Sequence, residues 1–189
     1  PYAVDACFRP DRRPDDVLAR LGVTEPYVVA VGGSPRRNLE MAVAAWRAVR
    51  EQRHVALVVV GTDDVPREPG VFGGRLDDES WADVLAGAEA LLYPTAYEGF
   101  GMPALEAAAS GTPVVCARVG SLPEVLGESA HWVTELSASA FATALGALLD
   151  DAALATDLRE RGLQTAAQHP SWSDAAQVYL AAYARASAG

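Results

Sequence analysis

The sequence predicts an α/β domain built on a Rossmann-like, doubly wound parallel sheet of about six strands, with helices at its C-terminal end. Short apolar runs rich in β-branched residues recur along the 189 residues, and helical patterns separate them. A continuous apolar run is typical of a strand buried on both faces, as parallel strands are. Ligands of such sheets bind beyond the carboxyl ends of the strands.

The first half of the chain predicts one short helix and the first strands of the sheet. Pro14–Leu21 favours a helix that Gly22 ends, and Tyr27–Gly32 and Val55–Gly61 favour buried strands. Val71-Phe72 is a possible short third strand. The helix between the first two strands carries one apolar stripe, formed by Leu39, Ala42, Val43, Trp46 and Val49.

The second half of the chain completes the predicted sheet. Trp81–Ala88 favours a helix, and three further strands are expected at Ala90–Tyr93, Pro113–Ala117 and Ala130–Val133, the last of them at an edge. Ser121-Leu-Pro-Glu124 has the pattern of a capping box that opens a short helix.

The C-terminal part of the chain, Ser137–Ser187, is expected to be helical. Ser171 and Asp174 predict the cap of the last helix. Three aromatic residues on helical stripes are expected to make core or interdomain contacts: Trp46, Trp172 and Tyr183.

Composition and charge exclude several classes of partner. The net charge of −10 argues against binding to nucleic acid or to an anionic membrane surface, but not against a small anionic ligand. No run of about 18 apolar residues predicts a transmembrane segment, and no signal segment opens the chain. Cys7 and Cys116 lack metal-ligand spacing, so we expect reduced thiols and a cytoplasmic location.

Five loops with glycine or arginine follow the predicted strands. Since the carboxyl ends of parallel strands meet at one edge of the sheet, these loops predict a ligand site there. They contain Gly33-Ser34, Gly61, Gly74-Arg75, Gly99-Phe100-Gly101 and Arg118–Gly120.

The fourth of these loops lies in Tyr93–Gly111, YPTAYEGFGMPALEAAASG, which reads as a strand end, a turn and a helix start. Two carboxylates, Glu98 and Glu106, stand eight residues apart around the turn. Pro103 is expected near the start of the helix, where its missing N–H costs nothing. The N–H groups of Gly101 to Ala104 are then expected to face an anion, such as a phosphate.

This stretch resembles the Glu-x(7)-Glu signature of retaining glycosyltransferases with the GT-B fold. EGFGMPALEAAASGTPVV is similar to the family pattern EGFGLPxLEAMAxGxPVV nearly throughout. The resemblance implies one half of a GT-B fold and a site for a nucleoside-diphosphate sugar. It also implies that Glu98 lies near the donor sugar and that Glu106 accepts hydrogen bonds from the ribose hydroxyls.

A second resemblance concerns the arginines after the first strand. PRRNLE is similar to the family's PRKNLE, which places Arg37 where the family has the lysine that grips the diphosphate. Many members also carry an arginine at the position of Gly33, and we expect Arg36 to compensate for that departure. The alternative, two solvated arginines at a helix start, would put cations where the helix dipole disfavours them.

The resulting site predictions separate catalytic from donor-binding residues. Ser34 could touch phosphate or only cap the helix, and Phe100 is expected to pack beneath the turn. The predicted catalytic residues are Glu98, Arg37 and Arg36; the predicted donor-binding residues are Gly33, Ser34, Gly61, Arg75, Leu76, Gly99, Phe100, Gly101, Met102 and Glu106.

No metal and no cofactor are expected besides the nucleotide-sugar substrate. The family typically dispenses with a metal ion. The paired aspartates of this chain are expected to be helix caps and solvated loops: Asp15-Asp16, Asp63-Asp64, Asp77-Asp78 and Asp150-Asp151.

The domain organisation follows from the same resemblance. Residues 1–13 are expected to be a connector, since PYAVDACFRP resembles the family's PNGVDxxxFxP, and 14–189 the nucleotide-sugar-binding domain, without the N-terminal acceptor domain that would be its partner. The predicted function is donor binding in a glycosyltransferase, with this domain inactive alone. A non-catalytic nucleotide-sugar-binding module is the alternative; a dinucleotide-dependent oxidoreductase is disfavoured because GGSPRR lacks the Gly-x-Gly-x-x-Gly pattern.

Overall fold

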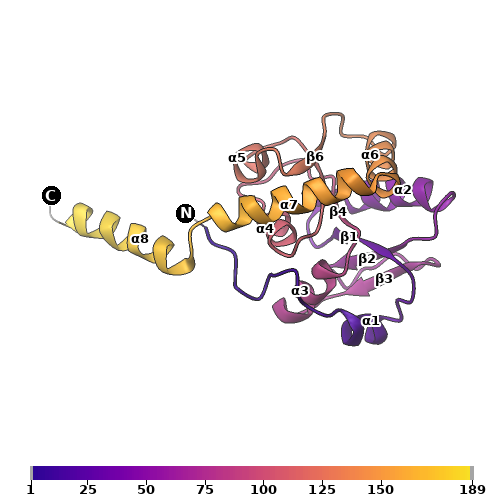
Figure 1. The fold of residues 1–189 in the computed structure, drawn as a ribbon, viewed down its shortest axis with the longest axis horizontal. Coiled ribbons are helices and arrows are strands. Elements are labelled where there is room, and N and C mark those ends of the chain that lie inside the picture. The colour runs from indigo at the N-terminus through magenta and orange to yellow at the C-terminus, as the bar shows by residue number, and fades with distance from the viewer. Residues whose placement is uncertain (1, 188–189) are drawn as a thin grey trace.

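The computed structural model describes residues 2–187 and contains one six-stranded parallel sheet (Figure 1). Pro1 of the expected connector and residues 188–189 of the expected domain lie outside the described residues. The strand order is β3-β2-β1-β4-β5-β6, so the order along the chain reverses between β1 and β4. The strands are β1 Tyr27–Val31, β2 Ala56–Val60, β3 Val71–Gly74, β4 Ala90–Tyr93, β5 Val114–Ala117 and β6 Ala130–Val133.

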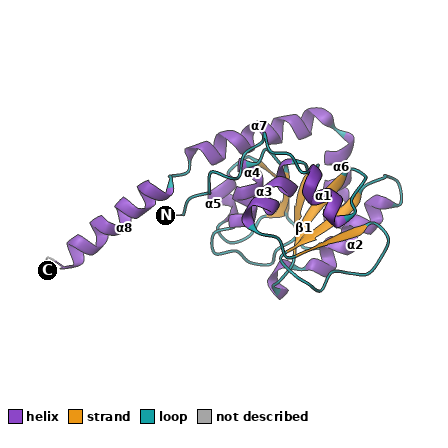
Figure 2. Ribbon diagram, turned by 90° about the horizontal axis from the view of Figure 1, so that it is seen from below, coloured by secondary structure: helices purple, strands orange, loops and turns teal. Residues whose placement is uncertain are grey.

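Helices cover both faces of this sheet (Figure 2). On one side lie α1 (Asp15–Leu21), α3 (Asp78–Ala86), α4 (Met102–Ala109) and α5 (Leu122–Leu126). On the other side lie α2 (Leu39–Arg50) and α6 (Ala138–Asp150). The remaining elements are the short 3-10 helix η1 (Pro35–Arg37), α7 (Ala152–Gln168) and α8 (Trp172–Ser187).

Side chains of the central strands alternate between the two cores. Val29 of β1 and Leu91 of β4 pack towards α3 and α4, whereas their neighbours Val28 and Leu92 pack towards α2 and α6. All four are fully buried. The predicted doubly wound α/β fold is confirmed, and the site-bearing loops are anchored on strands that are covered from both sides.

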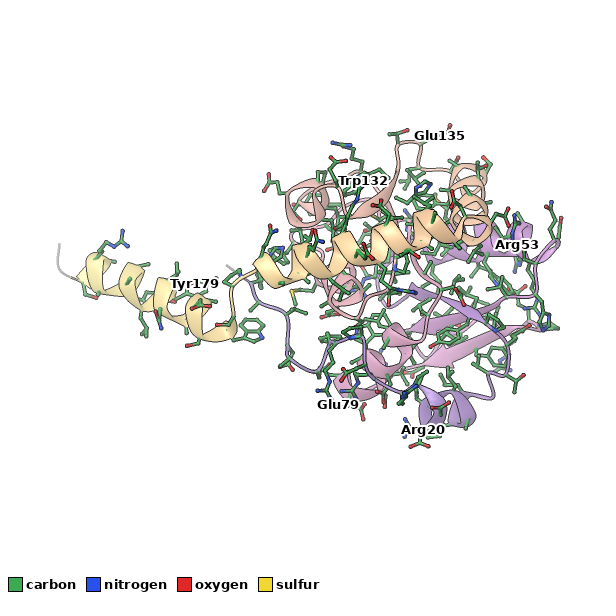
Figure 3. The ribbon with its side chains drawn as sticks, viewed as in Figure 1. Arg20, Arg53, Glu79, Trp132, Glu135 and Tyr179 are labelled. Atoms are coloured by element: carbon green, nitrogen blue, oxygen red, sulfur yellow. The ribbon has the colours of Figure 1, made fainter. Side chains whose placement is uncertain are left out.

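Helix α8 projects away from this body, beyond the end of α7 (Figure 1). The expected reciprocal cap is present: the Ser171 hydroxyl accepts from Asp174 N at 3.2 Å, and Asp174 accepts from Ser171 N at 3.0 Å. Trp172 and Tyr183, however, are 52% and 67% exposed, so they are not core residues of this chain, whereas Trp46 is. Tyr179 likewise stands on α8 far from the sheet (Figure 3).

Most element boundaries lie within one residue of the prediction, and the larger differences are in α3 and β3. Helix α3 begins at Asp78, three residues before the predicted Trp81, because the Asp77 carboxylate accepts a hydrogen bond of 2.8 Å from Ser80 N and caps the helix. Strand β3 extends to Gly74 and pairs with β2 along its whole length. Within residues 2–187, no single helix could span a bilayer, and only α6 taken with α7–α8, across a 98° bend, reaches the required length and composition.

Candidate functional site at the reversal of strand order

The loops after β1 and β4 meet at the point where the strand order reverses, which is the usual ligand crevice of such sheets. Hydrogen bonds join the two loops. The Arg36 carbonyl accepts from Ala96 N at 2.8 Å and from the Thr95 hydroxyl at 3.2 Å, and the Asn38 amide donates to the Pro94 carbonyl at 2.8 Å. The predicted meeting of these two loops at one edge is therefore confirmed.

Gly33 is a position that no side chain can occupy in this conformation. Its φ is +81°, in the left-handed region, and a Cβ there would collide with the Gly61 carbonyl oxygen of the neighbouring loop. An arginine at this position would require both loops to move. The departure from the family at Gly33 therefore has a local structural reason.

Arg37 is held by the backbone of the first loop. Its Nη1 donates to the Gly32 carbonyl at 2.6 Å, and its Nε is buried without a hydrogen-bond partner among the described residues. Its charge acts on two neighbours, because it lowers the pKa of both Tyr93 and Glu106 relative to what their burial alone would give. Arg37 thus brings a positive charge to the crevice between β1, β4 and α4.

Glu98 is the most deeply buried carboxylate of this edge, with 5% of its surface exposed. The Tyr93 hydroxyl donates to Oε1, and Arg36 Nε lies 3.7 Å from the same oxygen. Burial and the adjacent Glu98 raise the pKa of Tyr93, so the phenol remains a proton donor. The structure therefore brings together Glu98 and Arg36, two of the three residues that the sequence predicts as catalytic.

The loop after β5 holds the backbone of Glu98 through hydrogen bonds. Ser121 donates to the Glu98 carbonyl through both its N and its hydroxyl, each at 3.2 Å. A Cβ on Gly120 would collide with that carbonyl, so the two loops are in close contact. The predicted Ser121–Glu124 capping box is wrong: the Ser121 side chain makes no capping bond because it is committed to Glu98.

Glu106 lies on the first turns of α4 and contacts a residue that the sequence analysis did not assign to the site. Trp81 of α3 donates its indole N–H to Glu106 Oε2 at 2.8 Å. Burial and the nearby Asp78 raise the pKa of Glu106, and the indole N–H and Arg37 offset part of that increase. Trp81 is only the first residue of a predicted helix in the sequence, so no pattern pointed to this bond.

The start of α4 differs in detail from the prediction. Ala104 N donates to the Gly101 carbonyl at 3.0 Å and Pro103 has no N–H, so of these four residues only Gly101 and Met102 have N–H groups without a partner among the described residues. Gly101 has a φ of +97°, which allows the turn into the helix. Two of the four expected backbone donors are therefore available to an anion.

Phe100 packs beneath the turn, as expected, rather than forming a platform. Its ring centroid lies 4.8 Å from that of Tyr2 and 6.0 Å from that of His169. It also packs against the core cluster that contains α4 and α5. Phe100 therefore supports the turn that carries Glu98.

The remaining predicted residues lie along the same edge but make different contacts. Arg75 forms a 2.8 Å ion pair with Asp63, where both side chains are exposed, and Leu76 packs against the core. Ser34 makes no capping bond; it lines, together with Gly33, a hollow of about 920 Å³ on the α2 side of the loops. Glu98 and Glu106 are not among the residues that line this hollow.

Among residues 2–187, no group of three His, Cys, Asp or Glu side chains is placed to hold a metal ion. The charges of the crevice are two carboxylates and two guanidinium groups, accompanied by two free backbone N–H groups. Such a set can bind an anion with its donors and a polyhydroxylated group with its carboxylates.

Comparison with known proteins identifies the family. The family model for glycosyl transferases group 1 matches residues 25–151. The chain is 42% identical over 184 residues to MMP alpha-(1->4)-mannosyltransferase of Mycolicibacterium hassiacum, covering 88% of this chain and 45% of that protein. It therefore spans about half the length of this relative.

Two solved structures share the fold. Sucrose-phosphate synthase from Thermosynechococcus elongatus superposes with a TM-score of 0.79 and 27% identity, over 98% of this chain and 52% of that one. Anabaena HepE in complex with UDP and glucose superposes with a TM-score of 0.75 and 17% identity, over 96% and 53%. The chain belongs to the glycosyl transferases group 1 family, and its sheet and helices match the C-terminal domain of GT-B glycosyltransferases.

Proposed function

We propose that this chain is the donor-binding half of a retaining glycosyltransferase and that it binds a nucleoside-diphosphate sugar at the carboxyl edge of its sheet. The observation that carries the proposal is the pairing of Arg36 with the buried Glu98 beside the charge of Arg37, at the reversal of strand order. HepE, which has the same fold, was solved with UDP and glucose.

Each group has a role in the proposed site. The diphosphate gains negative charge as its bond to the sugar breaks. It lies against Arg36, Arg37 and the free N–H groups of Gly101 and Met102. Glu98 faces the sugar, whose anomeric carbon gains positive charge as the bond to the diphosphate breaks. Glu106 accepts hydrogen bonds from the ribose. Arg36 supplies the second cation that Gly33 cannot provide.

The test of donor binding is calorimetry and thermal melting of this chain with UDP, GDP and ADP. At least one nucleotide should bind and raise the melting temperature, because a ligand that binds only the folded state stabilises it. Arg37→Ala should weaken binding of that nucleotide by about 1–3 kcal/mol, the usual loss for a charged hydrogen bond.

Arg161→Ala is the matched control, since Arg161 forms an exposed ion pair with Asp157 on α7. It should leave affinity unchanged. Failure of all three nucleotides to bind would refute the proposed function, and an equal loss in both variants would remove Arg37 from the site.

The retaining mechanism requires a separate test. The chain would be joined to an acceptor-binding half from a group 1 relative, and the product of sugar transfer would be examined by NMR. The new glycosidic bond should have the same anomeric configuration as the donor. An inverted product would contradict the retaining mechanism, and a complex that binds donor without transfer would favour the non-catalytic module.

A further inference from the structure

Trp81 is a second buried aromatic donor at the site, in addition to Tyr93. Only 8% of its surface is exposed, yet its indole N–H reaches across from α3 to the carboxylate of Glu106 on α4. We propose that Trp81 is a positioning residue: it fixes Glu106 so that one carboxylate oxygen is committed to the protein and the other faces the ribose of the donor. The inference rests on the proposed function.

The hydrogen-bond pattern supports different roles for the two carboxylate oxygens of Glu106. Oε2 accepts from Trp81 at 2.8 Å, while Oε1 has no donor among the described residues. Oε1 is also absent from the buried atoms that lack a partner, so it reaches the surface. A carboxylate held through one oxygen keeps the other in a fixed place, which reduces the cost of ordering it when a ligand binds.

The indole N–H of Trp81 also affects the ionisation of Glu106. Burial and Asp78 favour the protonated form of Glu106, which would lose part of its capacity to accept. A hydrogen bond donated to the carboxylate stabilises the ionised form, and the charge of Arg37 acts in the same direction. Trp81 therefore keeps Glu106 both oriented and able to accept from a hydroxyl group.

The same hydrogen bond between Trp81 and Glu106 would be present if it only held α3 and α4 together. The structural role and the positioning role differ in which part of the ligand they affect. A structural bond would alter affinity for every nucleotide alike, whereas a positioning residue for the ribose would alter affinity only for nucleotides that carry the hydroxyl which Glu106 accepts.

The experiment compares ribonucleotides with their deoxy counterparts. Calorimetry measures Kd for UDP, GDP and ADP and for dUDP, dGDP and dADP, using wild type, Trp81→Phe and Glu106→Gln. Trp46→Phe is the control, because Trp46 is also buried but donates its indole N–H to a backbone carbonyl, that of Val55, at 3.0 Å.

The wild type should prefer the ribonucleotide of the bound base by about tenfold, the order expected for a hydrogen bond to a charged group. Trp81→Phe and Glu106→Gln should each reduce that ratio to about threefold or less, and the double variant should reduce it no further, since the two residues act as one unit. Trp46→Phe should keep the wild-type ratio, whatever its effect on stability.

An unchanged ribose-to-deoxyribose ratio in Trp81→Phe would overturn the inference, as would a wild-type ratio near one. Both outcomes leave the proposed function standing, because the nucleotides still bind. Absence of binding by all six nucleotides would refute the proposed function and this inference together.

Discussion

The two carboxylates of the site stand eight residues apart, but they are held by different neighbours. Glu98 is buried and accepts from the Tyr93 hydroxyl, with Arg36 near the same oxygen. Glu106 is less buried and accepts from the indole of Trp81. At this scale, each acid is oriented by an aromatic donor that the family signature does not contain.

Removing the donor to Glu98 should destabilise the fold. Tyr93→Phe leaves a buried carboxylate with one hydrogen bond fewer, and we expect a loss of about 1.5–3 kcal/mol in the free energy of unfolding, measured by urea denaturation. Tyr27→Phe is the matched control, because the buried Tyr27 hydroxyl donates at 2.8 Å to a neutral carbonyl, that of Val84. An equal or larger loss in the control would show that the Glu98 bond is not charge-assisted.

The raised pKa of Glu106 predicts a pH dependence of stability. Its folded-state pKa lies above the unfolded value of 4.5, so the folded state binds more protons between these two values. Stability of the wild type should therefore fall, relative to Glu106→Gln, as pH rises from about 4.5 through the folded-state pKa, and then level off. Urea denaturation at pH 4 to 8 measures the difference, and a constant difference or the opposite slope would contradict this expectation.

The backbone conformation of the loop after β1 depends on Gly33. Gly33→Ala puts a methyl group against the Gly61 carbonyl in a backbone conformation that alanine disfavours, so we expect a loss of about 1–3 kcal/mol in stability. Because the same loop carries Arg36 and Arg37, affinity for the nucleotide should fall as well. Gly99→Ala is the stability control, since a Cβ there meets nothing within 4 Å, and a comparable loss in both variants would refute the role of Gly33.

Helix α8 contributes little to the body of the domain. Only Ala175 is buried on it, whereas Val178, Leu180 and Tyr183 are each more than half exposed. Deleting residues 171–189 should therefore change the free energy of unfolding by less than about 1 kcal/mol. It should also reduce self-association, because it removes an exposed apolar surface. Urea denaturation and analytical ultracentrifugation measure the two effects, and a large loss of stability would show that α8 packs on the body.

The prediction from sequence succeeded where a pattern is local. Apolar runs identified β1, β2, β4 and β5, because a strand buried on both faces is apolar along its whole length. The partly buried β3 and β6 carry a weaker pattern and were expected only as a possible short strand and an edge strand. The prediction failed where a side chain forms a hydrogen bond with a residue of another element. Ser121 has the pattern of a helix cap but donates to Glu98, and Trp81 is predicted only as the start of a helix but donates to Glu106. Such bonds join residues 23 and 25 positions apart, which no local period reports.

At the scale of the whole molecule, the site is an edge rather than an enclosed pocket. Glu98 and Glu106 do not line the neighbouring hollow of about 920 Å³. We expect this chain to bind a nucleoside diphosphate but to transfer sugar slowly or not at all, because the other wall of the crevice would come from an acceptor-binding half. A radiolabelled transfer assay with the chain alone measures this, and turnover comparable to that of a full-length relative would contradict it.

Phe100 links two distant segments of the chain to the turn that carries Glu98. Its ring touches Tyr2, in the segment that enters the domain, and approaches His169, where α7 gives way to α8. The N-terminal segment and the α7–α8 junction thus both lie against one ring, two residues from Glu98. A displacement of either segment would therefore act on the ring that lies beneath the turn carrying Glu98.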